Sequence, residues 1–127
     1  EPEDWVIATG KTTSVRDFVK MSFIFLGIKL KFEGSGLNEK GYVHSCSNSK
    51  YQLPVGKEIV SIDKKYFRPT EVDLLVGDSS KAYSKLGWSP EYDLKSLINE
   101  MMDSDLKLML KEKYLIEKGF KTTKHQD

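Results

Sequence analysis

The sequence predicts a single α/β (or α+β) domain, and three observations support that prediction. Apolar residues recur at helical spacing in two long stretches. Several shorter stretches alternate apolar and polar residues or are rich in β-branched residues, as strands are. Helical and strand-like stretches are interspersed along 127 residues, which is the length of one domain.

The composition excludes several classes of protein. Hydrophobic residues make up 39% of the chain, enough to bury a core. Lys and Arg total 20 against 19 Asp and Glu, so the strong basic excess of a nucleic-acid binder is missing. Cys46 is the single cysteine, no apolar run is long enough to span a membrane, and "EPEDWVIATG" lacks the order of a signal peptide. We expect a soluble, cytoplasmic protein that binds neither nucleic acid nor membrane.

The first third of the chain predicts a strand and then a helix. Residues 4–9 ("DWVIAT") form an apolar, β-rich run of the kind buried on both faces inside a larger sheet, so we expect neighbouring strands to lie elsewhere. Ser14 and Asp17 resemble a capping box before an amphipathic stretch, and Gly27 supplies the left-handed stop.

The middle of the chain predicts three strands. Residues 28–33 ("IKLKFE") alternate apolar and charged side chains, as a half-buried strand does. Residues 42–47 and 58–63 predict the two strands of a long hairpin, and residues 64–67 ("KKYF") continue the second strand to an Arg-Pro break.

The last third predicts two helices and a tail. Asp78 is the expected N-cap of a short helix that Gly87 ends, with Ala82, Tyr83 and Leu86 on its apolar face. A long final helix carries a wide apolar stripe that we expect to pack in the core: Leu94, Leu97, Ile98, Met101, Met102, Leu106, Met109 and Leu110. One domain therefore spans residues 1–127, with 121–127 expected as a frayed tail.

Metal, nucleophile and phosphate-loop motifs are weak. His44 and Cys46 fall on one face of a strand, but a metal needs more ligands, and Cys46 has no neighbouring base in the sequence. "GSGLNEKG" matches neither a dinucleotide fingerprint nor a Walker motif. We predict no metal site and a flexible connection at these glycines.

Arg68 and Glu71, in "KKYFRPTEVD", flank Pro69 and allow two interpretations. They form a surface ion pair worth ~0–1 kcal/mol, or they bind a ligand together. In the second case, the guanidinium matches phosphate oxygens and the carboxylate accepts hydrogen bonds from a ribose diol. Arg16, at the start of a helix, could add a second positive charge. The residue chemistry alone leaves both interpretations open.

The order of the motifs resembles the C-terminal part of the bacterial GDP-mannose 4,6-dehydratase family, within the extended short-chain dehydrogenases. The likeness runs through "SVRDFVKMSFIFLGIKLKFEGSGLNEKG" and then "YFRPTEVDLLVGDSSKAYSKLGWSPEYDLKSLINEMM". The ordered signature "RPTEVD" followed by "GDSSKAYSKLGWSP" is far more specific than any short motif. It covers the chain from about Glu3 to about Phe120.

This resemblance implies an NADP-dependent lyase that converts GDP-mannose to GDP-4-keto-6-deoxymannose, the entry to GDP-fucose and related deoxysugars. It implies that a Rossmann domain, absent from this chain, holds NADP, that the present part binds the GDP-sugar, and that the parent enzyme is a homo-oligomer. It implies that Arg68 contacts the diphosphate and that Glu71 contacts the ribose hydroxyls. Arg16 also matches a family position.

The catalytic residues of the family are expected outside this chain. Its sequence has no dinucleotide fingerprint, and of its tyrosines only Tyr114 has a lysine, Lys118, four positions later, near the tail. We therefore expect no bound cofactor and no activity from these residues alone. Two alternatives remain: a dehydratase or epimerase for another nucleotide sugar, and a free-standing, non-catalytic binding or assembly module.

Overall fold

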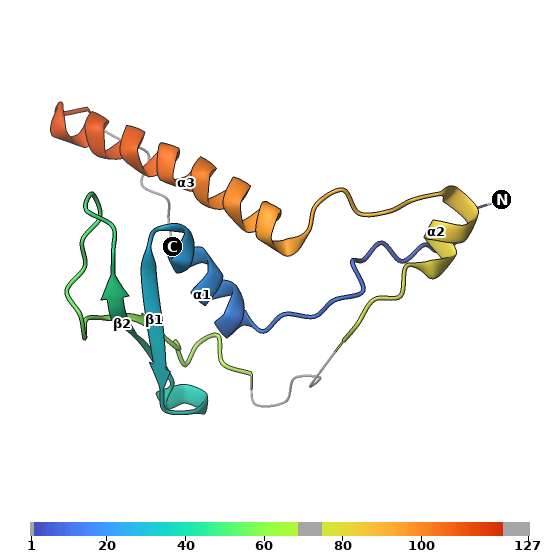
Figure 1. Cartoon of the computed structure of the whole chain (residues 1–127), viewed down its shortest axis with the longest axis horizontal. Helices are drawn as coiled ribbons and strands as arrows, with labels where there is room; N and C mark the ends of the chain where they lie inside the picture. The colour runs from blue at the N-terminus through green and yellow to red at the C-terminus, as the bar shows by residue number, and fades with distance from the viewer. Residues whose placement is uncertain (1, 69–74, 121–127) are drawn as a thin grey trace.

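A computed structural model describes residues 2–68 and 75–120 of the chain (Figure 1). Helices and one small sheet make up the described part, as the sequence predicts. The elements follow in the order α1 (Val15–Phe25), β1 (Ile28–Glu33), the 3-10 turn η1 (Gly36–Asn38), β2 (Lys40–Cys46), β3 (Glu58–Ser61), α2 (Ser80–Leu86) and α3 (Leu94–Glu117).

The three strands form an antiparallel sheet in the order β1-β2-β3. Leu30 of β1 faces Val43 of β2, and Phe32 faces Gly41. The predicted hairpin between the second and third strands is confirmed. Because the described sheet is antiparallel throughout, this part of the chain has the α+β form of the predicted fold class.

Local signals set both ends of α1, as predicted. The Ser14 hydroxyl accepts a hydrogen bond from the Asp17 backbone N–H at 3.1 Å, which satisfies one of the unpaired donors of the first turn. After the helix, Gly27 has φ 72°, which a residue with a side chain rarely adopts. The chain therefore reverses there and leads directly into β1.

The core lies where α1 packs between the sheet and α3 (Figure 1). Ile28 of β1 and Val43 of β2 are each 1% exposed, and Ile98 of α3 is 2% exposed. Burial of one such aliphatic side chain contributes about 1.5–3 kcal/mol. Few described side chains are buried to this degree, so the described residues have a small core.

The predicted apolar stripe of α3 is only partly buried. Ile98 is buried and Met102 and Leu106 are half-buried, but four other members are exposed: Leu97, Met101, Met109 and Leu110. The prediction that these four side chains pack in the core is wrong, because only one side of α3 meets α1. None of the described helices is both long enough and apolar enough to cross a membrane.

Two distant segments, 2–12 and 75–86, lie side by side away from the sheet (Figure 1), and we call them the arm. The Lys81 Nζ donates to the Asp4 carbonyl at 3.0 Å. Thr12 donates to the Leu75 carbonyl at 3.2 Å. A Cβ placed on Gly77 would lie 2.4 Å from the Cβ of Ala8, so the two backbones are in close contact.

Residues 4–9, predicted as a strand whose neighbours lie elsewhere, have no ladder partner among the described residues and are not assigned as a strand. Their apolar side chains are correspondingly uncovered, with Val6 52% and Ile7 58% exposed. An extended apolar segment needs a hydrogen-bonded neighbour on its edge to become a strand. The segment therefore keeps the composition of a buried strand without forming one.

Two further predictions differ from the structure at chain turns. Residues 64–67 do not extend β3, because Asp63 accepts a hydrogen bond from the Lys65 N–H at 2.9 Å and starts a turn. The N-cap of α2 is Ser79 rather than Asp78, although Asp78 accepts from the Ser80 N–H at 2.9 Å.

The face predicted for α2 is also partly wrong. Ala82 is buried, but Tyr83 is 67% and Leu86 58% exposed. Gly87 ends the helix as predicted, with φ 65°. The frayed tail predicted for 121–127 lies outside the described residues.

Asp93 caps α3 and is expected to make its stability depend on pH. The hydrogen bond from the Ser96 backbone, followed by that from the Ser96 hydroxyl, lowers the pKa of Asp93. Because the folded pKa lies below the unfolded value, the cap contributes fully above about pH 4 and is lost as the pH falls through the folded pKa.

Asp93→Ala should lower the melting temperature by about 2–6 °C at neutral pH. The difference from the wild type should shrink in acid, and melting curves followed by circular dichroism at several pH values measure it. A gap that stayed constant down to the lowest pH would contradict the assignment.

Candidate functional site

Arg68 is placed by a turn at the end of the sheet. After β3, the Tyr66 N–H donates to the Asp63 carbonyl at 3.1 Å, and the Phe67 N–H donates to the Lys64 carbonyl at 3.4 Å. These bonds bring Arg68 to the surface, where its side chain is exposed. Its predicted partner Glu71 lies outside the described residues, so the two interpretations of this motif stay open.

Arg16 lies in the first turn of α1 and pairs with a carboxylate from the turn between β1 and β2. Its Nε donates to Glu39 Oε1 at 2.5 Å. This hydrogen bond, and then the negative charge of Glu39, raises the pKa of Arg16. Glu39 is only 16% exposed, so the pair joins α1 firmly to the turn that follows β1.

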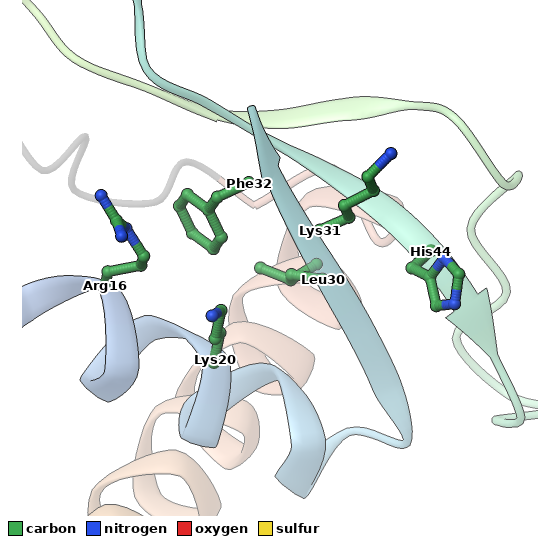
Figure 2. Close-up of a pocket in the computed structure, with 6 residues that line it drawn as sticks. All are labelled: Arg16, Lys20, Leu30, Lys31, Phe32 and His44. Carbon is green, nitrogen blue, oxygen red and sulfur yellow. The ribbon is translucent and has the colours of Figure 1, made fainter. Parts of the chain in front are cut away.

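Arg16 also lines a pocket of about 350 Å³ between α1 and β1. Its lining residues are Arg16, Lys20, Leu30, Lys31, Phe32 and His44, and we call it the Phe32 pocket. The Arg16 guanidinium carbon lies 6.0 Å from the centroid of the Phe32 ring, and the Lys20 Nζ lies 5.6 Å from it. Arg16 and Lys20 extend from α1 toward this ring, whereas Lys31 of β1 and His44 of β2 lie on the side of β1 away from the ring (Figure 2).

Of the lining residues, the sequence analysis chose only Arg16 as a ligand-binding candidate, and it considered His44 only as a weak metal ligand. Arg16 and Lys20 are four residues apart, which places them on one helix face, and that spacing could have identified Lys20. Phe32 follows from the alternation along residues 28–33. Glu39 gives no such signal, because 23 residues separate it from Arg16 and only the folded turn brings them together.

His44 and Cys46 do not form a metal site with other described residues. No group of three potential ligands occurs in the described part of the chain. His44 is exposed, whereas Cys46 is half-buried and its thiol donates to the Tyr51 carbonyl at 3.5 Å. This contact gives Cys46 a structural role in the turn after β2.

The Tyr114 and Lys118 pair is exposed on the outer end of α3. The Lys118 Nζ lies 5.7 Å from the centroid of the Tyr114 ring, and Tyr114 is 58% exposed. A cation over a ring face is a common surface contact worth about 0.5–1 kcal/mol. The pair is therefore a surface contact at the end of α3.

Comparison with known proteins places the chain in a family. The family model for "GDP-mannose 4,6 dehydratase" matches residues 1–101. A GDP-mannose 4,6-dehydratase of Vibrio cholerae is 50% identical over 109 residues, covering 85% of this chain and 29% of that protein.

Other relatives agree. A second Vibrio cholerae enzyme of that name is 46% identical over 121 residues, 94% of this chain and 32% of its own length. The human enzyme is 46% identical over 109 residues, 86% of this chain and 27% of its own length. The chain thus spans less than a third of the relatives it matches, and it belongs to the GDP-mannose 4,6-dehydratase family.

Proposed function

We propose that this chain is the part of a GDP-mannose 4,6-dehydratase that binds the GDP-sugar. The observation that supports it most is the family match, which includes "YFRPTE" within residues 1–101. The complete enzyme would convert GDP-mannose to GDP-4-keto-6-deoxymannose, as a lyase of nucleotide-sugar metabolism. We propose that it acts in the cytoplasm as a homo-oligomer.

In this proposal Arg68 binds the diphosphate of GDP-mannose and Glu71 accepts hydrogen bonds from its ribose. A planar guanidinium donates to two phosphate oxygens at once and remains charged when water is excluded. A surface position after a tight turn suits that role, because the Arg68 side chain is exposed. Arg16 would add positive charge from the first turn of α1.

NADP would be bound by polypeptide that this sequence does not contain. The nine glycines of the chain do not form a dinucleotide-binding fingerprint. We therefore assign no residue of this chain to the cofactor.

The arm is the proposed docking surface for the cofactor-binding Rossmann part of the enzyme. Its two segments run in close contact, and their apolar side chains are uncovered: Leu75 is 77% and Val76 56% exposed, beside Val6 and Ile7. Apolar groups gathered in this way commonly mark a protein interface. A further strand laid against residues 4–9 would supply the hydrogen-bonding neighbour that this segment lacks among the described residues.

Two measurements on the 127-residue chain test the proposal. Isothermal titration should show tighter binding of GDP-mannose than of UDP-glucose, because the proposal commits to a guanosine nucleotide. Equal affinity for both would favour the alternative of another nucleotide sugar, and no binding of either would contradict the proposal.

Incubation with GDP-mannose and NADP, followed by chromatography, should give no 4-keto-6-deoxy sugar, because the binding residues cannot replace the cofactor's chemistry. Steady formation of that product would show that catalytic residues are present in this chain.

A further inference from the structure

We propose that the Phe32 pocket binds the phosphate groups of a small anionic ligand at a place separate from Arg68. Arg68 does not line the pocket, whose six lining residues come from α1, β1 and β2. Arg16 is the one residue that the pocket shares with the proposed GDP-sugar site. Because of this overlap, the two proposals are tested with variants of residues that they do not share, Lys20 for the pocket and Arg68 for the GDP-sugar site.

The charge of the lining is positive. Three of its six residues are lysine or arginine, and none is an aspartate or glutamate. Two of the three cations have a carboxylate partner: Arg16 bonds Glu39 at 2.5 Å, and Lys31 pairs with Glu33 at 2.7 Å. Lys20 has no such partner among the described residues, so its charge is the one that an anion would neutralise.

The two cations of α1 contact the same aromatic ring. Arg16 and Lys20 are four residues apart and lie within 6.0 and 5.6 Å of the same ring centroid. Like charges at this spacing repel each other on a helix. An anion between them would relieve that repulsion, so the geometry favours a ligand with negative charge.

The Arg16 guanidinium is oriented before any ligand binds. Its Nε is occupied by Glu39, and this bond uses one of five N–H donors. The other four are on the two terminal nitrogens, which form the fork that matches phosphate oxygens. A donor group held in place in advance loses less conformational freedom on binding.

The size of the pocket fits a phosphate or diphosphate group with part of what it carries. Its volume of about 350 Å³ is at the lower end of the range for small-molecule sites. Leu30 and Phe32 supply an apolar floor beside the cations (Figure 2).

The test is a calorimetric titration of the 127-residue chain with inorganic pyrophosphate at low ionic strength. Lys20→Gln removes the charge and keeps a polar side chain that is one atom shorter, and it should weaken binding ~10-fold, as loss of a charged hydrogen bond does. Lys20→Arg should restore most of the affinity. The matched control is Lys50→Gln, since Lys50 also lies over an aromatic ring, 5.3 Å from the Tyr51 centroid. It should change affinity by less than ~2-fold.

Two further titrations show whether the ligand is a nucleoside diphosphate or phosphate alone, and whether the Phe32 pocket and the Arg68 site are separate. If GDP binds more tightly than pyrophosphate and both depend on Lys20, the pocket holds a nucleoside diphosphate; equal affinities mean that it recognises phosphate alone. Arg68→Ala should leave the Lys20-dependent part of pyrophosphate binding unchanged even where it weakens GDP-mannose binding. Loss of pyrophosphate binding in Arg68→Ala would overturn the separation of the sites.

The pocket proposal fails if the wild type shows no saturable pyrophosphate binding, or if Lys50→Gln weakens it as much as Lys20→Gln. Should Lys20→Gln not fold, the Phe32 ring resonances of the wild type are followed by NMR during the titration. Shifts of these resonances support the site, and unchanged resonances overturn it.

Discussion

Arg68→Ala, in a full-length dehydratase that carries this sequence, is expected to weaken GDP-mannose binding by ~2–4 kcal/mol, roughly 30- to 1,000-fold. This is the cost of truncating one partner of a charge pair from which water is excluded, since the phosphates would keep their charge and lose their donors. Glu71→Ala is expected to cost less, about 1.5–3 kcal/mol, as for a hydrogen bond to a charged group.

Calorimetric titration with GDP-mannose, paired with melting curves, measures both effects. Lys65→Ala is the matched control, because Lys65 is a cation in the same turn, with its Nζ 5.2 Å from the Tyr66 centroid. It should bind GDP-mannose as the wild type does. NADP affinity should be unchanged in all three variants.

An ion pair between Arg68 and Glu71 predicts the opposite pattern. Both variants would then lose at most ~1 kcal/mol of stability and bind GDP-mannose normally. Normal binding by Arg68→Ala would show that the role implied by the family does not apply to this residue.

Where signals are local, the sequence predicted the structure well. The two ends of α1 fall where Ser14, Asp17 and Gly27 predict them. A helix cap and a glycine with positive φ depend only on residues a few positions away. The alternation in residues 28–33 predicted β1 for the same reason. The family, too, followed from an ordered local signature, and the comparisons confirm it.

Predictions that needed distant partners were less accurate. Residues 4–9 have a strand's composition, but a strand also needs an edge to pair with, and composition does not supply one. Whether Met101 and Met109 are buried depends on which element packs against each side of α3, and the periodicity of the sequence does not show that. The Arg16–Glu39 pair, which organises the Phe32 pocket, forms only because η1 brings Glu39 back beside α1.

Gly34 controls that return of the chain. It has φ 83°, and a Cβ at this position would lie 2.3 Å from the Asn38 carbonyl oxygen and 2.9 Å from the Asn38 carbonyl carbon. These are backbone atoms, so the added methyl group cannot be accommodated by a rotating side chain. Glu39 follows Asn38 in the chain, so a shift of Asn38 also moves the Glu39 carboxylate that binds Arg16.

Gly34→Ala is expected to destabilise the chain by ~2–4 kcal/mol. A side chain in the left-handed region costs ~1 kcal/mol, and the close contact with the Asn38 backbone adds ~1–3 kcal/mol. Gly36→Ala is the matched control: Gly36 also has a positive φ, 55°, but nothing lies within 4 Å of its Cβ position. It should cost only the ~1 kcal/mol of the backbone term. Urea unfolding curves give both values, and the NMR resonance of Arg16 Nε reports whether Glu39 still binds it. Equal destabilisation by the two variants would mean that close packing at Gly34 does not hold this turn in place.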